Sequence, residues 1–132
     1  MDRPRNIGDL ARHAGVSAET IRYYEREGLM PQPSRTRSGR RVYTAGDLRT
    51  LTFIRKARRL GFALDDVRAL LALRGPNNSC DDVKAIAQRH LDSVRSNLRS
   101  IVEVERILAD ALARCPGGST RDCTLLDILE QV

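Results

Sequence analysis

The chain has 132 residues, with 23 Lys and Arg against 17 Asp and Glu and a net charge of +6. This is the length of one ordinary domain, which excludes a multidomain enzyme. A content of 41% hydrophobic and 4% aromatic residues, without Trp, favours a mainly helical, all-α fold over an aromatic-rich β-sandwich.

Two short helices are predicted at the start of the chain. The first lies between Asn6, which is an N-cap residue type, and Gly15, which is placed to end it. The second covers residues 18–27, with Ser17 as its N-cap and Gly28 as its stop. Two short helices around a tight turn form a candidate helix-turn-helix.

A basic segment, residues 29–43, follows the second helix. Its two prolines forbid a helix, and Gly39 suits the turn of a small hairpin, or wing. Guanidinium groups are fork-shaped donors suited to phosphate. Four arginines fall within seven residues here: Arg35, Arg37, Arg40 and Arg41. A disordered basic loop is the alternative.

Two more helices precede a break in the chain. Thr44 and Asp47 resemble a capping box that opens a helix ending at Gly61. A compact helix is expected over residues 63–73, and residues 75–78 then break the chain. We place a functional boundary there.

The positive charge lies before this boundary. Residues 1–74 carry a net charge of +8, and residues 75–132 carry −2. The asymmetry predicts a nucleic-acid-binding domain over 1–74 and another role for 75–132. A basic surface that serves only solubility is the alternative.

A long helix is predicted over residues 81–112, which contain no Gly or Pro. Its apolar residues alternate in steps of four and three, as in a coiled coil, with one interruption at Glu105. At about 48 Å the helix is too long to bury this seam on a neighbour of 74 residues, so we expect a homodimer. Packing onto the N-terminal helices is the alternative. The seam residues are Ala87, Leu91, Val94, Leu98, Ile101, Leu108 and Leu112.

The three cysteines flank this helix. Cys115 and Cys123 stand at the two ends of a short loop after the helix, whereas Cys80 lies at the other end of the helix, about 50 Å from Cys115. If two copies pair antiparallel, Cys80 of one copy meets Cys115 and Cys123 of the other. Thiolates favour soft ions such as Hg(II), Cd(II), Pb(II), Cu(I) and Zn(II). This arrangement predicts two three-thiolate metal sites per dimer.

Other interpretations of the cysteines stay open. Cys80 and Cys115 can be small buried residues, or Cys115 and Cys123 can form a redox-sensitive disulfide. No run of about 18 apolar residues and no signal segment occurs, so we expect a cytoplasmic protein without a membrane span. His13 and His90 lie far apart, no catalytic constellation stands out, and we expect no enzyme activity.

The assembled motifs resemble the MerR family of bacterial transcription regulators over essentially the whole chain. The resemblance implies a winged helix-turn-helix domain, a long antiparallel coiled-coil dimerisation helix and a C-terminal metal-binding loop. It also implies a dimer that bends and untwists promoter DNA for RNA polymerase when its effector binds. The matching segments are Ile7-Gly-Asp-Leu-Ala, Gly15-Val-Ser-Ala-Glu-Thr-Ile-Arg-Tyr-Tyr-Glu25, Gly28-Leu29, Gly39-Arg-Arg-Val-Tyr43, Phe53-Ile54 and Leu60-Gly-Phe-Ala-Leu-Asp-Asp-Val67.

The resemblance also implies DNA-contacting residues. Arg22, Tyr23 and Arg41 match family positions that contact DNA. Tyr23 and Tyr24 are adjacent on a helix, so one of the two rings is expected to pack inward. The family more often has Tyr at the position of Arg40, so a phosphate contact replaces an aromatic one there. Further candidates are Ser17, Tyr24, Arg37 and Arg40.

Cys80, Cys115 and Cys123 resemble the metal-sensing branch of the family. Copper(I) sensors generally have Ser where Cys80 stands, so Cys80 indicates a divalent ion. The loop length resembles the copper type, and the loop lacks the extra Cys or His of zinc sensors. We favour Hg(II), with Pb(II) and Cd(II) next. The alternatives are Cu(I) or Zn(II), a thiol-redox response, or a DNA-binding module without an effector.

Overall fold

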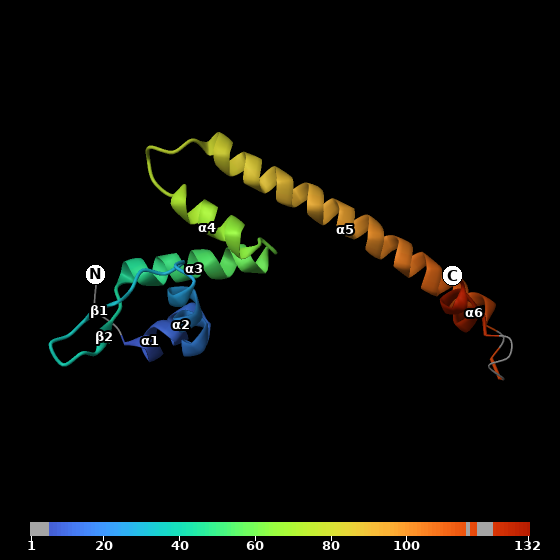
Figure 1. Cartoon of the computed structure of the whole chain (residues 1–132), viewed down its shortest axis with the longest axis horizontal. Coiled ribbons are helices and arrows are strands. Elements are labelled where there is room, and N and C mark those ends of the chain that lie inside the picture. Colours follow the sequence, from blue (N-terminus) through green and yellow to red (C-terminus); the bar gives the residue numbers. More distant parts are fainter. Residues whose placement is uncertain (1–5, 116, 119–122) are drawn as a thin grey trace. The chain divides into compact units, whose positions relative to one another are not determined.

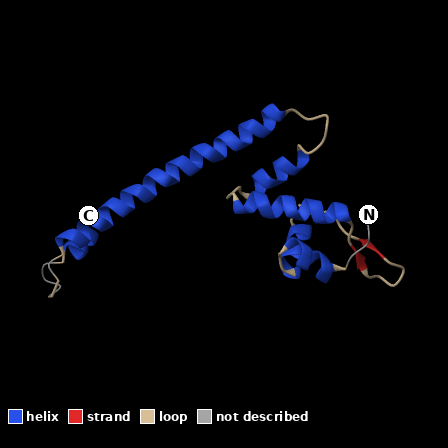
Figure 2. Ribbon diagram, turned by 180° about the vertical axis from the view of Figure 1, so that it is seen from behind, coloured by secondary structure: helices blue, strands red, loops and turns tan. Residues whose placement is uncertain are grey.

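The computed structural model describes residues 6–115, 117–118 and 123–132. These residues form helices and one small two-stranded sheet (Figures 1 and 2), which confirms the mainly helical class. The described residues divide into two compact units, one ending at Ile86 and one starting at Ala87. In chain order the elements are α1 (Ile7–Ala14), α2 (Ala18–Arg26), β1 (Ser34–Arg35), β2 (Arg41–Val42), α3 (Ala45–Arg59), α4 (Leu64–Ala72), α5 (Cys80–Arg114) and α6 (Thr124–Glu130).

Helices α1 and α2 are delimited by the residues that the sequence indicated. The Asn6 side chain caps α1, and Gly15 ends it with a left-handed φ of +70°. The positive φ favours glycine at this position, and a Cβ there would also lie 3.3 Å from the guanidinium carbon of Arg55, which would have to shift slightly. Ser17 Oγ accepts a hydrogen bond from Thr20 N at 3.1 Å and caps α2. The predicted helix-turn-helix is confirmed.

The basic segment forms the predicted hairpin. Strands β1 and β2 pair antiparallel, with Ser34 opposite Val42 and Arg35 opposite Arg41. The turn between them contains Gly39, whose φ is +85°. The hairpin therefore projects a run of arginines from a defined backbone.

Helix α3 begins at the predicted capping box. Asp47 N donates to Thr44 Oγ1 at 3.2 Å, and Thr44 N donates to Asp47 Oδ2 at 2.9 Å. Two orphan amides at the start of the helix are thus satisfied. The chain turns at Gly61, whose φ is +88°, and enters α4.

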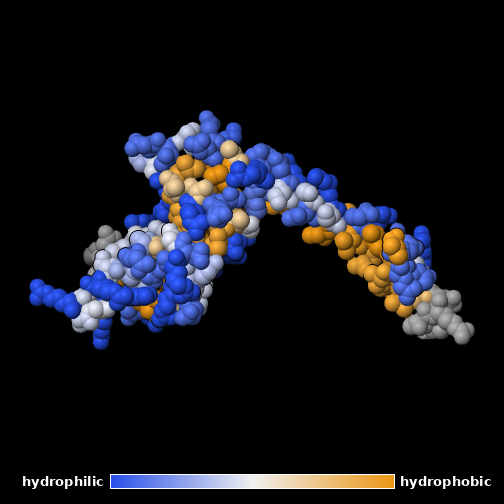
Figure 3. Space-filling view, viewed as in Figure 1, coloured by the Kyte–Doolittle hydropathy of each residue, from blue (hydrophilic) through white to orange (hydrophobic). Residues whose placement is uncertain are grey.

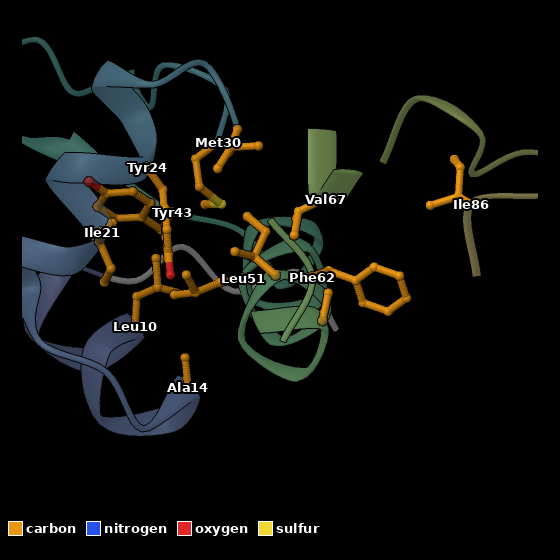
Figure 4. Packing of buried hydrophobic residues seen from close by; sticks show 13 residues of the cluster. Leu10, Ala14, Ile21, Tyr24, Met30, Tyr43, Leu51, Phe62, Val67 and Ile86 are labelled. Carbon is orange, nitrogen blue, oxygen red and sulfur yellow. The ribbon is translucent and has the colours of Figure 1, made fainter. Parts of the chain in front are cut away.

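One hydrophobic core holds the first unit together (Figure 4). Leu10, Tyr43 and Leu51 are fully buried and converge where α1, the end of the wing and α3 meet. Ile86, in the second turn of α5, also belongs to this core. The first compact unit therefore includes the start of α5, while the functional boundary after residue 74 stays a prediction.

Helix α5 is continuous over 35 residues and begins and ends close to the predicted bounds. Within the second unit Ala111 is buried. Cys123 occupies the N-cap position of helix α6, but its side chain makes no hydrogen bond to the helix. Among the described residues, no helix has the length and apolar character needed to cross a membrane.

Candidate DNA-binding and metal-binding sites

Helix α2 presents two of the predicted DNA-contacting residues at the surface. Tyr23 is 38% exposed, and Arg22 is held by an ion pair to Glu19 at 2.8 Å. Tyr24 is only 8% exposed and packs in the core. One ring of the tyrosine pair points inward, as predicted, so Arg22 and Tyr23 form the accessible face of the helix.

The hydroxyl of Ser17 caps helix α2, which limits its availability for a contact with DNA. Its Oγ accepts from Thr20 N and also lies 2.9 Å from Thr20 Oγ1. The hydroxyl is therefore largely occupied by the cap of α2. Its position at the N-terminus of the helix still places it where backbone amides and the helix dipole favour an anion such as phosphate.

The hairpin arginines differ in how they are held. Arg37 and Arg40 are exposed. Arg35 donates from Nη1 to the carbonyl oxygen of Gly39 at 2.8 Å, which braces the turn. Arg41 is partly buried, because it lies at the base of the hairpin against α2. Two of these arginines are thus free to reach a phosphate backbone, and two also have intramolecular contacts.

Sequence reasoning missed Glu25, the charged partner at the base of the hairpin. Glu25 is 5% exposed, and its Oε1 accepts hydrogen bonds from Tyr43 Oη at 2.9 Å and Arg41 Nη1 at 3.2 Å. Burial, followed by the hydrogen bond to Glu25, raises the pKa of Tyr43, so its hydroxyl stays protonated and donates. The available signal was spacing: Glu25 lies four residues after fully buried Ile21, which puts it on the core face of α2.

The predicted seam of α5 is exposed in the single chain, and further apolar residues outside it are exposed as well (Figure 3). Val102, Val104 and Ile107 are exposed in addition to the seam residues. Glu103 and Arg106 pair on the same helix at 2.5 Å, and the guanidinium lowers the pKa of the Glu103 carboxyl. The exposed seam residues are Leu91, Val94, Leu98, Ile101, Leu108 and Leu112.

The cysteines stand at the two ends of α5. Cys80 is its first residue and Cys115 follows its last residue; both are exposed free thiols, so neither is a small buried residue in the single chain. Cys123 is a partly exposed free thiol that precedes α6. Most of the loop that should bring Cys115 and Cys123 together, with residues 116 and 119–122, lies outside the described residues.

No group of three or more His, Cys, Asp or Glu side chains that could hold a metal ion occurs within the described part of one chain. The donor chemistry nevertheless fits a soft ion, because all three thiols are unpaired and none is sealed in the core. Cys80 and Cys115 stand at opposite ends of one continuous helix of 35 residues, so these two thiols of one chain cannot bind the same ion.

Comparison with known proteins identifies the class of regulator. Residues 5–73 match the MerR HTH family of regulatory proteins, and residues 48–111 match the MerR DNA-binding family. The chain belongs to the MerR family. As a MerR-family member it is a DNA-binding transcription regulator and not an enzyme, in agreement with the helix-turn-helix and the wing.

Three known proteins illustrate the likeness. A "heavy metal-dependent transcription regulator 2" of Rhizobium meliloti is 38% identical over 123 residues, covering 92% of this chain and 84% of the relative. PbrR691 of Ralstonia metallidurans, solved in complex with lead(II), is 36% identical with a TM-score of 0.83, over 95% of this chain and 98% of that one. MerR of Bacillus megaterium, solved with mercury(II), is 30% identical with a TM-score of 0.72, over 96% and 100%.

Proposed function

We propose that this MerR-family chain is a metal-responsive regulator that binds promoter DNA as a homodimer and activates metal-resistance genes. On binding a thiophilic divalent ion, the dimer distorts the promoter so that RNA polymerase can use it. The observation that carries the proposal is the position of free thiols at both ends of a helix whose apolar face is exposed.

The first unit supplies the DNA contacts of the proposal. Arg22 and Tyr23 on α2 enter the major groove, and Arg41 at the base of the wing contacts a phosphate. Ser17, Tyr24, Arg37 and Arg40 remain secondary candidates, with Arg37 and Arg40 favoured over Tyr24 because they are exposed. Two copies bind two half-sites, so the DNA between them is held at both ends and can be deformed.

Helix α5 supplies the dimer contact. Its exposed apolar side chains occupy the heptad spacing of a coiled coil, and leaving them in water is unfavourable. An antiparallel pair of identical helices buries the same face on both copies, which is the simplest closed arrangement. In this pair the start of one α5 lies beside the end of the other.

The metal ligands of the proposal come from both copies. Cys80 of one copy joins Cys115 and Cys123 of the second copy, and a bound ion would link the two subunits through thiolates. Three thiolates without His favour large soft ions, so we propose Hg(II) first and Pb(II) or Cd(II) next. Two relatives solved with bound ions, one with lead(II) and one with mercury(II), support a metal ligand for this chain but do not rank these ions.

Transcription in vitro tests the proposal and names the inducer. The promoter upstream of the protein's own gene is transcribed under anaerobic reducing conditions, with Hg(II), Pb(II), Cd(II), Zn(II) and Cu(I) titrated in a competing thiol buffer. We expect the response at the lowest free concentration to come from one soft divalent ion. Cys80→Ser should abolish it, whereas Ser96→Ala, on the exposed middle of the same helix, should leave it intact.

The other outcomes each contradict the proposal in a distinct way. A divalent response that survives in Cys80→Ser contradicts the shared site. A response to Cu(I) that needs only Cys115 and Cys123 identifies a copper sensor instead. Silence with every metal, together with a response to mild oxidant, identifies a thiol-redox regulator.

A further inference from the structure

We infer that Glu25 is a positioning residue for DNA binding: its buried carboxylate holds Arg41 of the wing in the orientation in which it contacts a phosphate. The inference rests on the proposed contact between Arg41 and DNA. It adds a residue on the core face of the recognition helix that itself makes no contact with the duplex.

The geometry makes Glu25 a bridge between the two DNA-binding elements. It belongs to α2, only two residues after Tyr23, and its Oε1 receives both Arg41 Nη1 from β2 and Tyr43 Oη from the residue after that strand. Its Oε2 is buried and has no hydrogen-bond partner among the described residues. All the described hydrogen bonds of the carboxylate are therefore directed at the wing.

Arg41 can contact Glu25 and a DNA phosphate at the same time. Its side chain is 32% exposed, and it meets Glu25 through Nη1. A guanidinium is planar and carries five N–H donors, so fixing one nitrogen sets the direction of the others. The contact with Glu25 thus orients the remaining donors of Arg41 before DNA arrives and reduces the ordering cost of the phosphate contact.

Electrostatics alone would give Glu25 the opposite effect. A carboxylate close to a DNA-binding arginine repels phosphate, so removing its charge should tighten binding and steepen the salt dependence. Positioning predicts weaker binding and a shallower dependence, because a misaligned Arg41 no longer neutralises its phosphate. The sign of the change therefore separates the two roles.

The test measures the affinity of the full-length protein for promoter DNA over a series of salt concentrations. Glu25→Gln keeps the size of the side chain and an oxygen for Tyr43, but it removes the charge that holds Arg41. We expect roughly tenfold weaker binding, and a slope of log affinity against log salt that is shallower by about 1.8 for the dimer, because each copy loses one phosphate contact. Arg41→Ala should give the same two changes, and adding Glu25→Gln to it should cause no further loss.

Two matched variants isolate the effect. Glu27→Gln removes the same charge from the end of the same helix, where the side chain is 44% exposed, and should not make the slope shallower. Tyr43→Phe removes the other hydrogen bond to Glu25 and should lower thermal stability while keeping the slope. If Glu25→Gln fails to fold, Glu25→Asp keeps the charge but shortens the reach to Arg41, and it should show the same shallower slope.

The outcomes separate this inference from the proposed function. If Arg41→Ala leaves the slope unchanged, the proposed phosphate contact itself is wrong. If Arg41→Ala makes the slope shallower but Glu25→Gln leaves it unchanged or steepens it, the positioning role of Glu25 is overturned. Losses from Glu25→Gln and Arg41→Ala that add in the double variant also overturn it, since they would reflect separate contributions.

Discussion

At the scale of single residues, the buried group formed by Glu25, Arg41 and Tyr43 explains how a basic wing is fastened to a helical domain. A carboxylate buried at this position is costly unless it is paired and hydrogen-bonded, and both partners come from the wing. The group therefore joins α2 to the wing. Removal of the Arg41 side chain would leave the negative charge of Glu25 in the core without its cationic partner.

Tyr43 gives this group a measurable pH dependence. Its pKa is raised above 10.0 by burial and then by its hydrogen bond to Glu25, so the folded state binds the phenol proton more tightly than the unfolded state. The free energy of unfolding should therefore be independent of this proton below about pH 10 and fall as the pH rises above it. Chemical denaturation from pH 8 to 11 measures this loss, which should be smaller in Tyr43→Phe and unchanged in Tyr23→Phe.

Gly15 is a second position where one residue decides local structure. An L side chain in the left-handed region costs about 1–2 kcal/mol, and here a Cβ also meets the Arg55 guanidinium at 3.3 Å. We expect Gly15→Ala to lower the free energy of unfolding by at least that amount. Gly46→Ala, in the first turn of α3 without a positive φ, is the matched control and should be neutral or stabilising. Equal losses in both would contradict this account of the turn.

At the scale of elements, the helix bounds were predictable because local chemistry sets them. Asn6 and Ser17 cap α1 and α2, and Thr44 with Asp47 opens α3. Contacts between residues far apart in the sequence could not be predicted in this way, because no local sequence pattern indicates them. The bridge from Glu25 to Tyr43 spans 18 residues, and Arg68 of α4 donates to the Glu27 carbonyl oxygen at the end of α2 from 41 residues away.

The sequence indicates the candidate ligands of the proposed metal site, and both their role and their assembly into one site stay predictions. Cys80 and Cys115 stand out in the sequence because they bracket one uninterrupted helix. In the proposed site their meeting depends on a second copy, whose position is a property of the proposed dimer and not of the single chain. The single chain therefore shows the donors and the exposed apolar face but not the coordination.

The apolar face of α5 makes a direct prediction about assembly. Leu98 lies in the middle of the seam and is exposed in the single chain. A charge there would have to be buried in the dimer, so Leu98→Glu should shift the protein to monomer in sedimentation experiments at micromolar concentration. Asn97→Glu places the same charge one residue away, outside the seam, and should remain dimeric. A Leu98→Glu protein that stays fully dimeric would contradict pairing through this face.

At the scale of the whole molecule, charge separates two functions along one chain. The basic first half carries the recognition helix and the wing, and the slightly acidic second half carries the proposed dimer face and all three thiols. In the proposed mechanism the two are coupled, because a ligand that stabilises one dimer geometry over another would change how two DNA-binding units hold a duplex.

DNA binding should therefore depend steeply on salt and on named arginines. Arg22→Ala and Arg41→Ala should each weaken promoter binding, and Arg41→Ala should also make the slope of log affinity against log salt shallower by about 1.8, because each copy in the dimer loses one phosphate contact. Arg99→Ala, on exposed α5, serves as a control for loss of a positive charge outside the first unit and should change neither quantity appreciably. Unaltered affinity in both Arg22→Ala and Arg41→Ala would remove the wing-and-helix account of DNA binding.

The measurement that tests the central claim most directly is the number of Hg(II) ions held by a mixed dimer. One copy carries Cys80→Ser and the other carries Cys115→Ser with Cys123→Ser, and bound metal is counted after dialysis against a competing thiol. Each variant alone should hold no ion, while the mixed dimer should hold one, because it contains one complete three-thiolate site. A mixed dimer without metal, or full binding by Cys80→Ser alone, would contradict a site shared between two copies.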